Sequence, residues 1–573
     1  MNVIDKINDK DKSRRPGSGR RAARNFPKGR LLDPKDRDRL GDIVGEAGGD
    51  GPLARDLLIE YLHEIQDSER CLPAGLLHAL AERMHIPMAE IYEVASFYAH
   101  FDIVDDDEEK PPPVTIRVCD SVTCMMAGSE TLIAELQAAA LDGVRVLRAP
   151  CMGRCANAPV CEVGHGHVDD ATAASVAATV KSGDLHPKIP AYKDFKAYLA
   201  EGGYGVLKAC LAGEKSVEDV IAVLGDAGLA GLGGAGFPTG RKWGLVRDTQ
   251  GPRLMAVNGD EGEPGTFKDR YFLETDPCAF LEGMLIGAWA VEAEAVYLYM
   301  RDEYPAALEI LRREIAAVEQ AGLSGHTKIH LRRGAGAYIC GEESAMIESI
   351  EGKRGLPRHR PPYVAEVGIF GRPTLVNNIE TLYWVPQILE NGADWFASKG
   401  INGAKGLRSY SVSGRVKNPG VKIVPAGVTA RQLVDEYSGG MCDGHQFKGY
   451  LPGGASGGIL PARLADIPLD FGTLAEHGAF VGSHAVVILS DADDMKAIAL
   501  NLMRFFEDES CGQCTPCRTG TEKAVKLMER ESWDIDALND LAIVMADASI
   551  CGLGQAAPNP LTSVLKFFPG DIR

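Results

Sequence analysis

Apolar residues recur every three or four positions in two parts of the chain, near its beginning and at its end. This spacing puts them on one face of a helix, so it predicts helices in the first hundred residues, where Pro73 and Pro87 interrupt the pattern, and again beyond Asp491. We therefore predict a small helical bundle over 36–108 and a second helical domain over 491–573.

The middle of the chain alternates between apolar strands and helical segments. In 109–195 the strand-like runs VTIRVC and VRVLRAPC flank a helical run, and the hairpin pattern VCEVGHGHV follows them. In 196–400 the apolar runs RLMAVN, AVYLYM and KIHLRR are separated by glycine-rich loops and long helices, which is typical of a doubly wound α/β domain. Short strands and turns over 401–490 predict a small β-rich domain. The chain is thus predicted to be a multidomain protein of α/β and α class.

Three cysteines lie close together in the sequence ESCGQCTPCRTG, residues 509–520. Two residues separate Cys511 from Cys514 and Cys514 from Cys517, a spacing that lets successive thiolates reach three corners of one [4Fe-4S] cluster. Cys551 is the candidate fourth ligand, because a helix out and a helix back would return the chain to the same end of a bundle. Zinc is the alternative, although zinc sites usually pair two separate C-x-x-C motifs.

A second set of four cysteines lies upstream. Cys119 and Cys124 follow one predicted strand, and Cys151 and Cys155 follow another, so two loops at one end of a small sheet could hold a metal centre. Four ligands suit a [2Fe-2S] cluster. The six other cysteines are predicted to be small buried apolar residues: Cys71, Cys161, Cys210, Cys278, Cys340 and Cys442.

Charge and composition narrow the function further. The net charge of −19 argues against nucleic acid as the main partner, since binding phosphate requires surplus Lys and Arg. The most apolar stretch, 280–300, contains three glutamates and does not qualify as a membrane span. Fourteen cysteines with no apolar secretory signal ahead of them indicate reduced thiols and metal ligands, which predicts a cytoplasmic protein. Residues 1–35 are predicted to be a basic tail, either disordered or bound to an acidic partner.

Glycines, carboxylates and amides gather in four segments of the predicted α/β domain. Among the glycines of GLAGLGGAGFPTGRKW, 228–243, backbone N–H groups could approach a phosphate, with Lys242 as the counter-charge. The segments 256–270, 334–345 and 372–382 carry carboxylates and amides that suit hydrogen bonds to ribityl or ribose hydroxyls. A flexible glycine loop and solvated acidic turns are the alternatives that this pattern leaves open.

Taken in order along the chain, these motifs resemble a fusion of the two hydrophilic subunits that form the NADH-oxidising tip of respiratory complex I. The four upstream cysteines match its [2Fe-2S] subunit, and GGAGFPTGRKW, NGDEGEPGTFKDR, GAYICGEES, NNIETL and the C-terminal cysteine motif match its FMN subunit. The resemblance implies a helical plus thioredoxin-like [2Fe-2S] domain over 36–195, a Rossmann-like FMN domain, a ubiquitin-like β-grasp domain of the SLBB type, and a C-terminal four-helix bundle with [4Fe-4S].

The resemblance also implies which residues contact the cofactors. FMN would be lined by Gly231, Gly233, Gly234, Gly236, Lys242, Asn258, Asp260, Glu261, Tyr338, Gly341, Glu342, Asn377, Asn378 and Thr381. NAD(H) would face Phe237, Glu263 and Glu343, with Arg360 and Tyr363 on the adenine side. The chain departs from the family pattern in RPPY, where KPPF is usual, and at Leu232, where an arginine is usual.

The implied reaction is hydride exchange between nicotinamide and flavin, which needs no catalytic acid or base from the protein, with single electrons passed to the clusters. Fused chains of this kind resemble diaphorase subunits, and LPRHRPPYVAEVGIFGRPTLVNN is more similar to the formate dehydrogenase branch. This implies a catalytic partner subunit with Mo or W bis-pterin and iron–sulfur clusters. The alternatives are the diaphorase subunit of an NAD-reducing hydrogenase, with hydrogenase subunits as partners, and a passive iron–sulfur electron-transfer scaffold.

Overall fold

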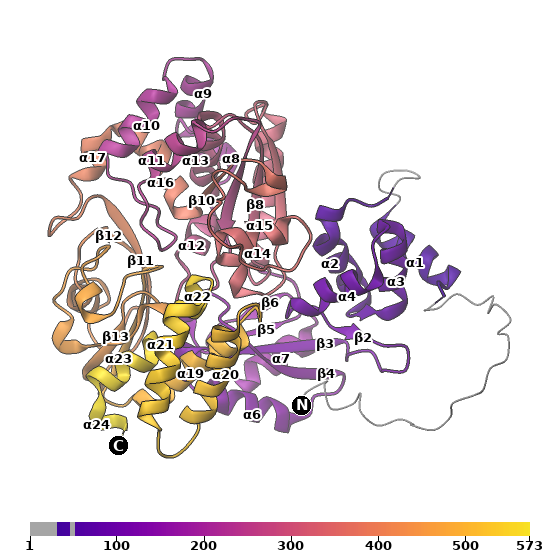
Figure 1. Cartoon of the computed structure of the whole chain (residues 1–573), viewed down its shortest axis with the longest axis vertical. Helices are drawn as coiled ribbons and strands as arrows, with labels where there is room; N and C mark the ends of the chain where they lie inside the picture. Colours follow the sequence, from indigo (N-terminus) through magenta and orange to yellow (C-terminus); the bar gives the residue numbers. More distant parts are fainter. Residues whose placement is uncertain (1–30, 46–51, 573) are drawn as a thin grey trace, which may run out of the picture.

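The computed structural model describes residues 31–45 and 52–572, so the predicted basic tail lies almost wholly outside the described residues (Figure 1). Four helices form the first domain, α1 (Pro34–Val44), α2 (Leu58–Glu69), α3 (Ala74–Met84) and α4 (Met88–Phe97). A short parallel pair of strands, β1 (Leu72–Pro73) and β2 (Ile103–Val104), joins them. Pro73 and Pro87 are the N-cap residues of α3 and α4, where a proline costs no helical hydrogen bond.

The second domain is a four-stranded sheet in the order β4-β3-β5-β6. Its strands are β3 (Val114–Cys119), β4 (Val144–Ala149), β5 (Cys161–Val163) and β6 (Gly166–Val168). β3 and β4 run parallel, so both end at the same edge of the sheet, where Cys119 pairs in register with Ala149. The helices of this domain are α5 (Val122–Met126), α6 (Ser129–Ala139) and α7 (Ala173–Ser182).

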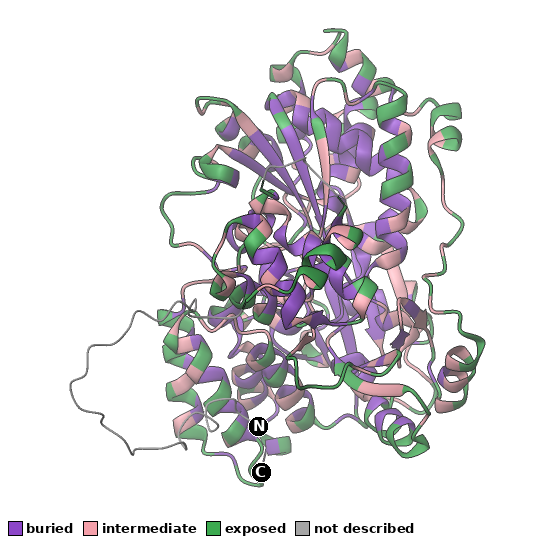
Figure 2. Ribbon diagram, turned by 90° about the vertical axis from the view of Figure 1, so that its right-hand side faces the viewer, coloured by how far each residue is buried: buried purple, intermediate pink, exposed green. Residues whose placement is uncertain are grey.

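The third domain is built on a fully parallel sheet in the order β10-β7-β8-β9. The strands are β7 (Arg253–Gly259), β8 (Ala293–Met300), β9 (Lys328–Arg333) and β10 (Thr374–Asn378). Helices cover both faces, which explains why the strands read as nearly continuous apolar runs (Figure 2). The helices of this domain are α8 (Phe195–Ala200), α9 (Gly205–Leu211), α10 (Val217–Asp226), α11 (Thr239–Arg247), α12 (Lys268–Thr275), α13 (Pro277–Ala290), α14 (Pro305–Gln320), α15 (Glu343–Ile350), α16 (Ile379–Asn391) and α17 (Ala393–Ala397).

The strand order of this parallel sheet indicates where a ligand would bind. The chain passes from β7 to β8 on one side and later returns to β10 on the other side, so the direction of the crossovers reverses between β7 and β10. In open parallel sheets, ligands bind outside the carboxyl ends of the strands at such a switch point. The carboxyl ends of β7 and β10 carry Asn258 and Asn378, which are paired in register.

A mixed five-stranded sheet follows, in the order β12-β11-β15-β13-β14. It consists of β11 (Leu407–Gly414), β12 (Gly420–Pro425), β13 (Phe447–Leu451), β14 (Leu460–Pro461) and β15 (Ala485–Ser490). The first and last of these strands, β11 and β15, are parallel neighbours at the centre, and the other pairs are antiparallel. Tyr410, Leu433 and Val486 belong to this domain's hydrophobic core, and Phe567 of the C-terminal helices packs against it.

The chain ends in a helical domain, coloured yellow in Figure 1. Its helices are α19 (Met495–Asp508), α20 (Thr515–Met528), α21 (Ile535–Ala548), α22 (Gly552–Ala556), α23 (Asn559–Phe567) and α24 (Pro569–Ile572). One hydrophobic core joins this domain to the first helical domain and to the parallel sheet, with Leu502, Leu77 and Ala256 among its residues. Among the described residues no helix combines the length and apolar character that crossing a membrane requires.

Candidate cofactor and electron-transfer site

The switch point of the parallel sheet is lined by side chains whose hydrogen bonds fix their direction. Asn258 accepts the N–H of Asp260 at 3.0 Å and donates to the carbonyl of Gly341 at 2.8 Å. Asn378 is the N-cap of α16, and its amide donates to Asp269 at 2.6 Å. The two asparagines thus connect the ends of β7 and β10 to the Gly341 segment and to the start of α12.

The glycine loop, Ala230–Pro238, lies beside these asparagines. The N–H of Gly231 donates to the carbonyl of Phe237 at 2.8 Å, which closes the loop on itself. Gly236 has a φ of +66°, and a Cβ atom there would lie 2.7 Å from the ring of Phe471. A Cβ atom on Gly233 would lie 3.0 Å from Asn378. The loop therefore requires glycine both for its backbone conformation and for its close packing.

The glycine loop follows helix α10 and not a strand. Its GxGxxG sequence is therefore not the first turn of a βαβ dinucleotide-binding unit, where a strand leads directly into the glycines. Lys242, on α11, donates to the carbonyl of Val376 at 3.2 Å, and burial lowers its pKa. The hydroxyl oxygen of Thr381 accepts the N–H of Leu232 at 2.8 Å, so this buried side chain fixes the backbone of the glycine loop.

Two adjoining cavities, of about 390 and 610 Å³, occupy this edge of the sheet. Both are lined by Gly233, Gly234, Asn258, Gly341, Glu342 and Asn378. Asp260, Glu261, Glu263 and Tyr338 line the smaller one, and Gly231, Gly236, Phe237, Lys242, Glu343, Arg360 and Asn377 line the larger one. Of the residues expected to contact FMN or NAD(H), Thr381 and Tyr363 line neither cavity; Thr381 is buried and Tyr363 is 55% exposed.

Buried carboxyl groups form one wall of the smaller cavity. Burial raises the pKa of Asp260, and its Oδ2 atom has no hydrogen-bond partner among the described residues. Burial also raises the pKa of Glu261 to about 7, and Glu261 accepts the hydroxyl of Tyr304 at 2.9 Å. Glu263 accepts the hydroxyl of Tyr338, and burial raises its pKa as well.

Two glutamates at the start of α15 face the larger cavity. Glu342 is the N-cap of the helix and accepts the N–H groups of Ser344 and Ala345, both at 3.0 Å. Arg360 forms ion pairs with Glu342 and, at 3.0 Å, with Glu343. The guanidinium group of Arg360 is therefore held at the cavity wall by these two carboxylates.

The two cavities fit a flavin nucleotide. Gly233 and Gly234 bring backbone without a Cβ atom to both cavities, and the N–H groups of the glycine loop and Lys242 offer partners for a phosphate. The unpaired Oδ2 of Asp260 offers a partner for an N–H or O–H donor of a ring or a hydroxyl group.

The upstream cysteines come together as one buried set. Cys119 ends β3, Cys124 lies in α5, and Cys151 and Cys155 lie after β4. All four are at most 5% exposed, and the sulfur atoms of Cys151 and Cys155 are 3.3 Å apart. The thiols of Cys124 and Cys151 raise the pKa of Cys119, which indicates direct contact among them. Four sulfur atoms facing one another in a buried space fit an iron–sulfur cluster.

The C-terminal cysteines also come together, at the ends of helices. Cys514 is the N-cap of α20 and Cys551 the N-cap of α22, while α20 and α21 lead out and back between them. Burial is the largest of the causes that raise the pKa of Cys517 to about 11, and the nearby thiols Cys514, Cys551 and Cys511 contribute to this rise, so the four thiols lie near one another. Cys551 lines the larger cavity together with the glycine loop. The C-terminal cysteine set therefore borders the larger of the two cavities at the β7–β10 edge directly.

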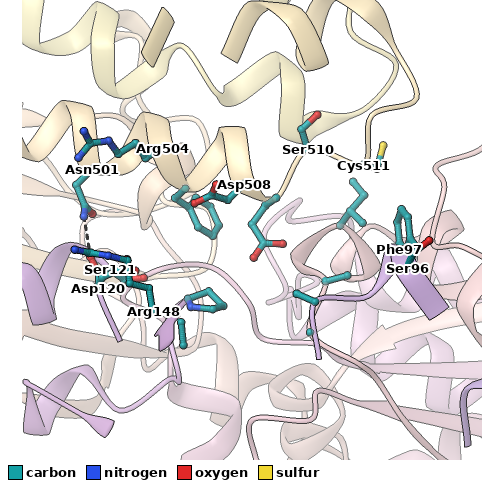
Figure 3. A pocket seen from close by; sticks show the side chains of 18 of the residues that line it. Ser96, Phe97, Asp120, Ser121, Arg148, Asn501, Arg504, Asp508, Ser510 and Cys511 are labelled. Atoms are coloured by element: carbon teal, nitrogen blue, oxygen red, sulfur yellow. Dashed lines mark hydrogen bonds and ion pairs between the residues drawn. The ribbon is translucent and has the colours of Figure 1, made fainter. Parts of the chain in front are cut away.

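A third cavity, of 720 Å³, lies between α19 and the four-stranded sheet (Figure 3). Asp120 and Arg148 come from the sheet, and Arg504 and Asp508 come from α19 on the opposite side. Asn501 bridges the two sides by donating to the carbonyl of Asp120 at 2.8 Å. Cys511 lies on the wall of this cavity, so the C-terminal cysteine set borders two separate spaces.

Some residues of the site are not predicted by the sequence patterns. Ser456, Phe480 and Gly482 reach the smaller cavity from the five-stranded domain, and the N–H of Ser456 donates to Glu263 at 2.6 Å. The pattern LPGGASGG predicts only a turn of the β-rich domain, and its density of glycines is the signal that could have indicated a site. Lys268 and Asp269 also line this cavity, and they lie inside the motif NGDEGEPGTFKDR, beyond the acidic residues expected to contact the cofactors.

Comparison with known proteins agrees with this architecture. Residues 49–183 match the thioredoxin-like [2Fe-2S] ferredoxin family, residues 224–387 the Nuo51 FMN-binding domain, and residues 497–573 the NADH-ubiquinone oxidoreductase-F iron–sulfur binding region. The chain thus contains domains that bind FMN, [2Fe-2S] and [4Fe-4S], as the sequence predicted, and it is an NADH-oxidising FMN and iron–sulfur diaphorase subunit that transfers electrons.

Individual relatives define the family more closely. The F 2 subunit of NADH-quinone oxidoreductase in Rhizobium meliloti (strain 1021) is 40% identical over 390 residues, which cover 65% of this chain and 92% of that protein. The chain belongs to the family of NADH-quinone oxidoreductase F subunits. The NADP-reducing hydrogenase subunit HndC of Solidesulfovibrio fructosivorans is 38% identical over 65% of this chain and 79% of its own length.

A solved structure matches a larger part of the chain. A chain in the crystal structure of an NAD+-reducing [NiFe]-hydrogenase in the air-oxidized state superposes with a TM-score of 0.79 and 32% identity, over 91% of this chain and 93% of its own. The predicted fusion of a [2Fe-2S] and an FMN subunit is confirmed by the three family matches within this one chain. None of these relatives is named as a formate dehydrogenase, so that part of the prediction stays a prediction.

Proposed function

We propose that this chain exchanges hydride between NAD(H) and FMN at the β7–β10 edge and exchanges single electrons with clusters held by the two cysteine sets. The observation that carries this proposal is the larger cavity, whose wall contains both the glycine loop and Cys551. A flavin in that cavity would lie against a ligand of the [4Fe-4S] cluster. FMN, when bound, supplies the conversion between two-electron and one-electron transfer.

The chain's own residues have the task of binding and orienting the cofactors. The glycine loop and Lys242 would hold the phosphate, and Asn258, Asp260 and Glu261 would hydrogen-bond the flavin and its ribityl chain. Tyr338, Gly341, Glu342, Asn377 and Asn378 would complete the wall, with Thr381 supporting the loop from behind. No side chain is assigned as a catalytic acid or base.

Five residues are proposed to face NAD(H). Phe237 is partly exposed in the larger cavity, where its ring could stack on a base or nicotinamide, and Glu263 and Glu343 lie on the walls of the two cavities. Arg360, held by Glu342 and Glu343, and the exposed Tyr363 are proposed for the adenine side. An exposed tyrosine suits a substrate that enters and leaves from solvent.

The domain assignments have topological support. The five strands after residue 400 are arranged, in their local order, as 2-1-5-3-4 with a parallel central pair, which supports a ubiquitin-like β-grasp domain of the SLBB type over 401–490. The four longest C-terminal helices, α19, α20, α21 and α23, support a four-helix bundle over 491–573. The parallel sheet supports a Rossmann-like FMN domain over 196–400.

For the partner we propose a formate-oxidising catalytic subunit with Mo or W bis-pterin. Its support is the likeness of LPRHRPPYVAEVGIFGRPTLVNN to the formate dehydrogenase branch. The second candidate is the diaphorase subunit of an NAD-reducing hydrogenase, favoured by the match of 91% of this chain to a chain of an NAD+-reducing [NiFe]-hydrogenase. Metal analysis of the complex that co-purifies with the tagged chain separates the two: we expect Mo or W, while Ni in its place would establish the hydrogenase.

The hydride-exchange proposal is tested on the purified chain alone. We expect FMN and iron with little zinc, bleaching at flavin wavelengths when NADH is added under nitrogen, and NADH:ferricyanide activity. Cluster absorbance without bleaching would leave a passive electron-transfer scaffold, and a colourless zinc protein would contradict the cluster assignment.

A further inference from the structure

Arg301 connects the buried cysteine set to the flavin-shaped cavity. It follows directly after β8, and its Nη2 atom donates to the carbonyl of Cys151 at 2.6 Å. Its Nη1 atom donates to the carbonyl of Glu261, which lines the smaller cavity. One guanidinium group therefore holds the backbone of a proposed [2Fe-2S] ligand and the backbone of a proposed FMN contact at the same time.

Among the described residues, one carboxylate pairs directly with the buried charge of Arg301. Its side chain is 4% exposed, and its Nε atom pairs with Glu303 at 3.1 Å. The side chain of Glu303 is 19% exposed, so water screens the carboxylate more than it screens the guanidinium. The ring of Tyr304 lies 4.9 Å from the guanidinium carbon and adds a favourable contact that leaves the positive charge in place.

A second arginine touches the same cysteine loop and provides a comparison. Arg270 donates from Nε to the carbonyl of Gly153 at 2.9 Å, and its Nη1 atom pairs with Glu274 at 2.6 Å. The two side chains of this pair are similarly exposed, at 14% and 12%, and the pair is shorter than the 3.1 Å pair of Arg301 with Glu303. Arg301 differs because its carboxylate partner lies nearer to solvent than the guanidinium does.

A buried cation beside an iron–sulfur cluster stabilises the reduced cluster, because reduction adds a negative charge to a centre already surrounded by thiolates. We propose that Arg301 is a positioning residue that raises the reduction potential of the [2Fe-2S] cluster and anchors the loop of Cys151 to the wall of the FMN cavity. This inference rests on the proposed ligand set Cys119, Cys124, Cys151 and Cys155. Its consequence is that the [2Fe-2S] cluster accepts electrons from the flavin more readily than an uncompensated thiolate cluster would.

The test is an EPR-monitored redox titration of the full chain with its cofactors, in the wild type and three variants. Arg301→Gln is expected to weaken reduction of the [2Fe-2S] cluster about tenfold, which is about 59 mV toward negative potential for a one-electron couple. Glu303→Gln is expected to shift the potential in the opposite direction, because it removes the compensating carboxylate. Arg270→Gln, the matched control on the same loop, is expected to shift it by less than half as much as Arg301→Gln.

Opposite signs for Arg301→Gln and Glu303→Gln support the inference, since a loss of packing alone has no reason to produce them. An unchanged potential in Arg301→Gln, or shifts of the same sign in both variants, would overturn it. If Arg301→Gln does not fold, two other results test the inference. Glu303→Gln should shift the reduction potential of the [2Fe-2S] cluster to a more positive value, and Arg301→Lys, which keeps the positive charge, should leave that potential unchanged. A wild-type chain with no [2Fe-2S] signal, or a signal that survives Cys155→Ser, would instead refute the ligand set, which is a separate failure.

Discussion

The two cysteine sets differ in how the chain surrounds them. The upstream set is at most 5% exposed, and Cys151 and Cys155 pack against Phe267 of the parallel-sheet domain. In the C-terminal set only Cys517 is fully buried, and Cys511 and Cys551 lie on the walls of two cavities. A cluster in the first position would be buried among domains, whereas one in the second would lie between the larger cavity of the β7–β10 edge and the cavity of Figure 3. We therefore expect the C-terminal cluster to be on the route to a partner and the upstream cluster to be a second acceptor.

The largest effect on electron transfer is expected from replacing one cysteine of the C-terminal set. Cys514→Ser is expected to remove the [4Fe-4S] EPR signal and to stop electron flow to the partner, while NADH still reduces FMN, because Cys514 lines neither of the two cavities proposed for the flavin. Partner-linked NAD turnover and flavin bleaching measure the two steps separately. A partner-linked rate like that of the wild type would contradict the proposed route.

Replacing one cysteine of the upstream set tests whether the two clusters differ in their role in electron transfer. Cys155→Ser is expected to remove the [2Fe-2S] signal but to retain most of the partner-linked rate, since this set borders neither the larger of the two cavities proposed for the flavin nor the cavity of Figure 3. Iron per chain and both EPR signals serve as controls. An equal loss of partner-linked rate in Cys155→Ser and Cys514→Ser would place both clusters on the main route.

A substitution in the glycine loop is expected to have a smaller effect than the loss of a cysteine. It acts on the two cavities proposed for the flavin, from which both clusters would receive electrons. Gly236→Ala is expected to weaken FMN binding about tenfold and to lower the free energy of unfolding by about 1–2 kcal/mol, because alanine is strained at a φ of +66° and its Cβ would lie 2.7 Å from Phe471. Gly244→Ala, in α11 with nothing within 4 Å, is the matched control. Equal FMN dissociation constants in the two variants would show that the loop does not hold the cofactor.

The smallest expected effect is a pH dependence of stability in the domain that contains the upstream cysteines. Burial raises the pKa of Glu162, on β5, to about 7. Between about pH 4.5 and 7 the folded protein keeps a proton that the unfolded chain releases, so its contribution to stability falls as the pH rises through this range and is constant above it. We expect a decrease of order 1–3 kcal/mol, measured as the pH dependence of the melting temperature. Glu162→Gln should flatten this dependence, and an unchanged slope would contradict the assignment.

Local pattern was enough to predict many elements of the fold. The runs VTIRVC, RLMAVN and AVYLYM form β3, β7 and β8, and Pro73 and Pro87 cap helices as their conformational limits require. The strand order of the parallel sheet could not be predicted in this way, nor could the element that precedes the glycine loop. Helix α10 takes that place, and the loop that follows it is fixed by contacts from elsewhere in the chain: the N–H of Leu232 donates to Thr381, and Gly233 packs close to Asn378.

Two cluster sites and a phosphate-binding glycine loop are predicted by the spacing of the thiols and the density of glycines, which are local properties. The cofactors FMN, [2Fe-2S] and [4Fe-4S] are implied by the resemblance of the motifs, in their order along the chain, to a known family. Three contacts became visible only in the folded chain: Cys551 shares a wall with the glycine loop, Ser456 reaches Glu263 from another domain, and Arg301 joins Cys151 to Glu261. Such contacts arise when distant segments pack into a common core, and no local pattern encodes which buried partners then meet.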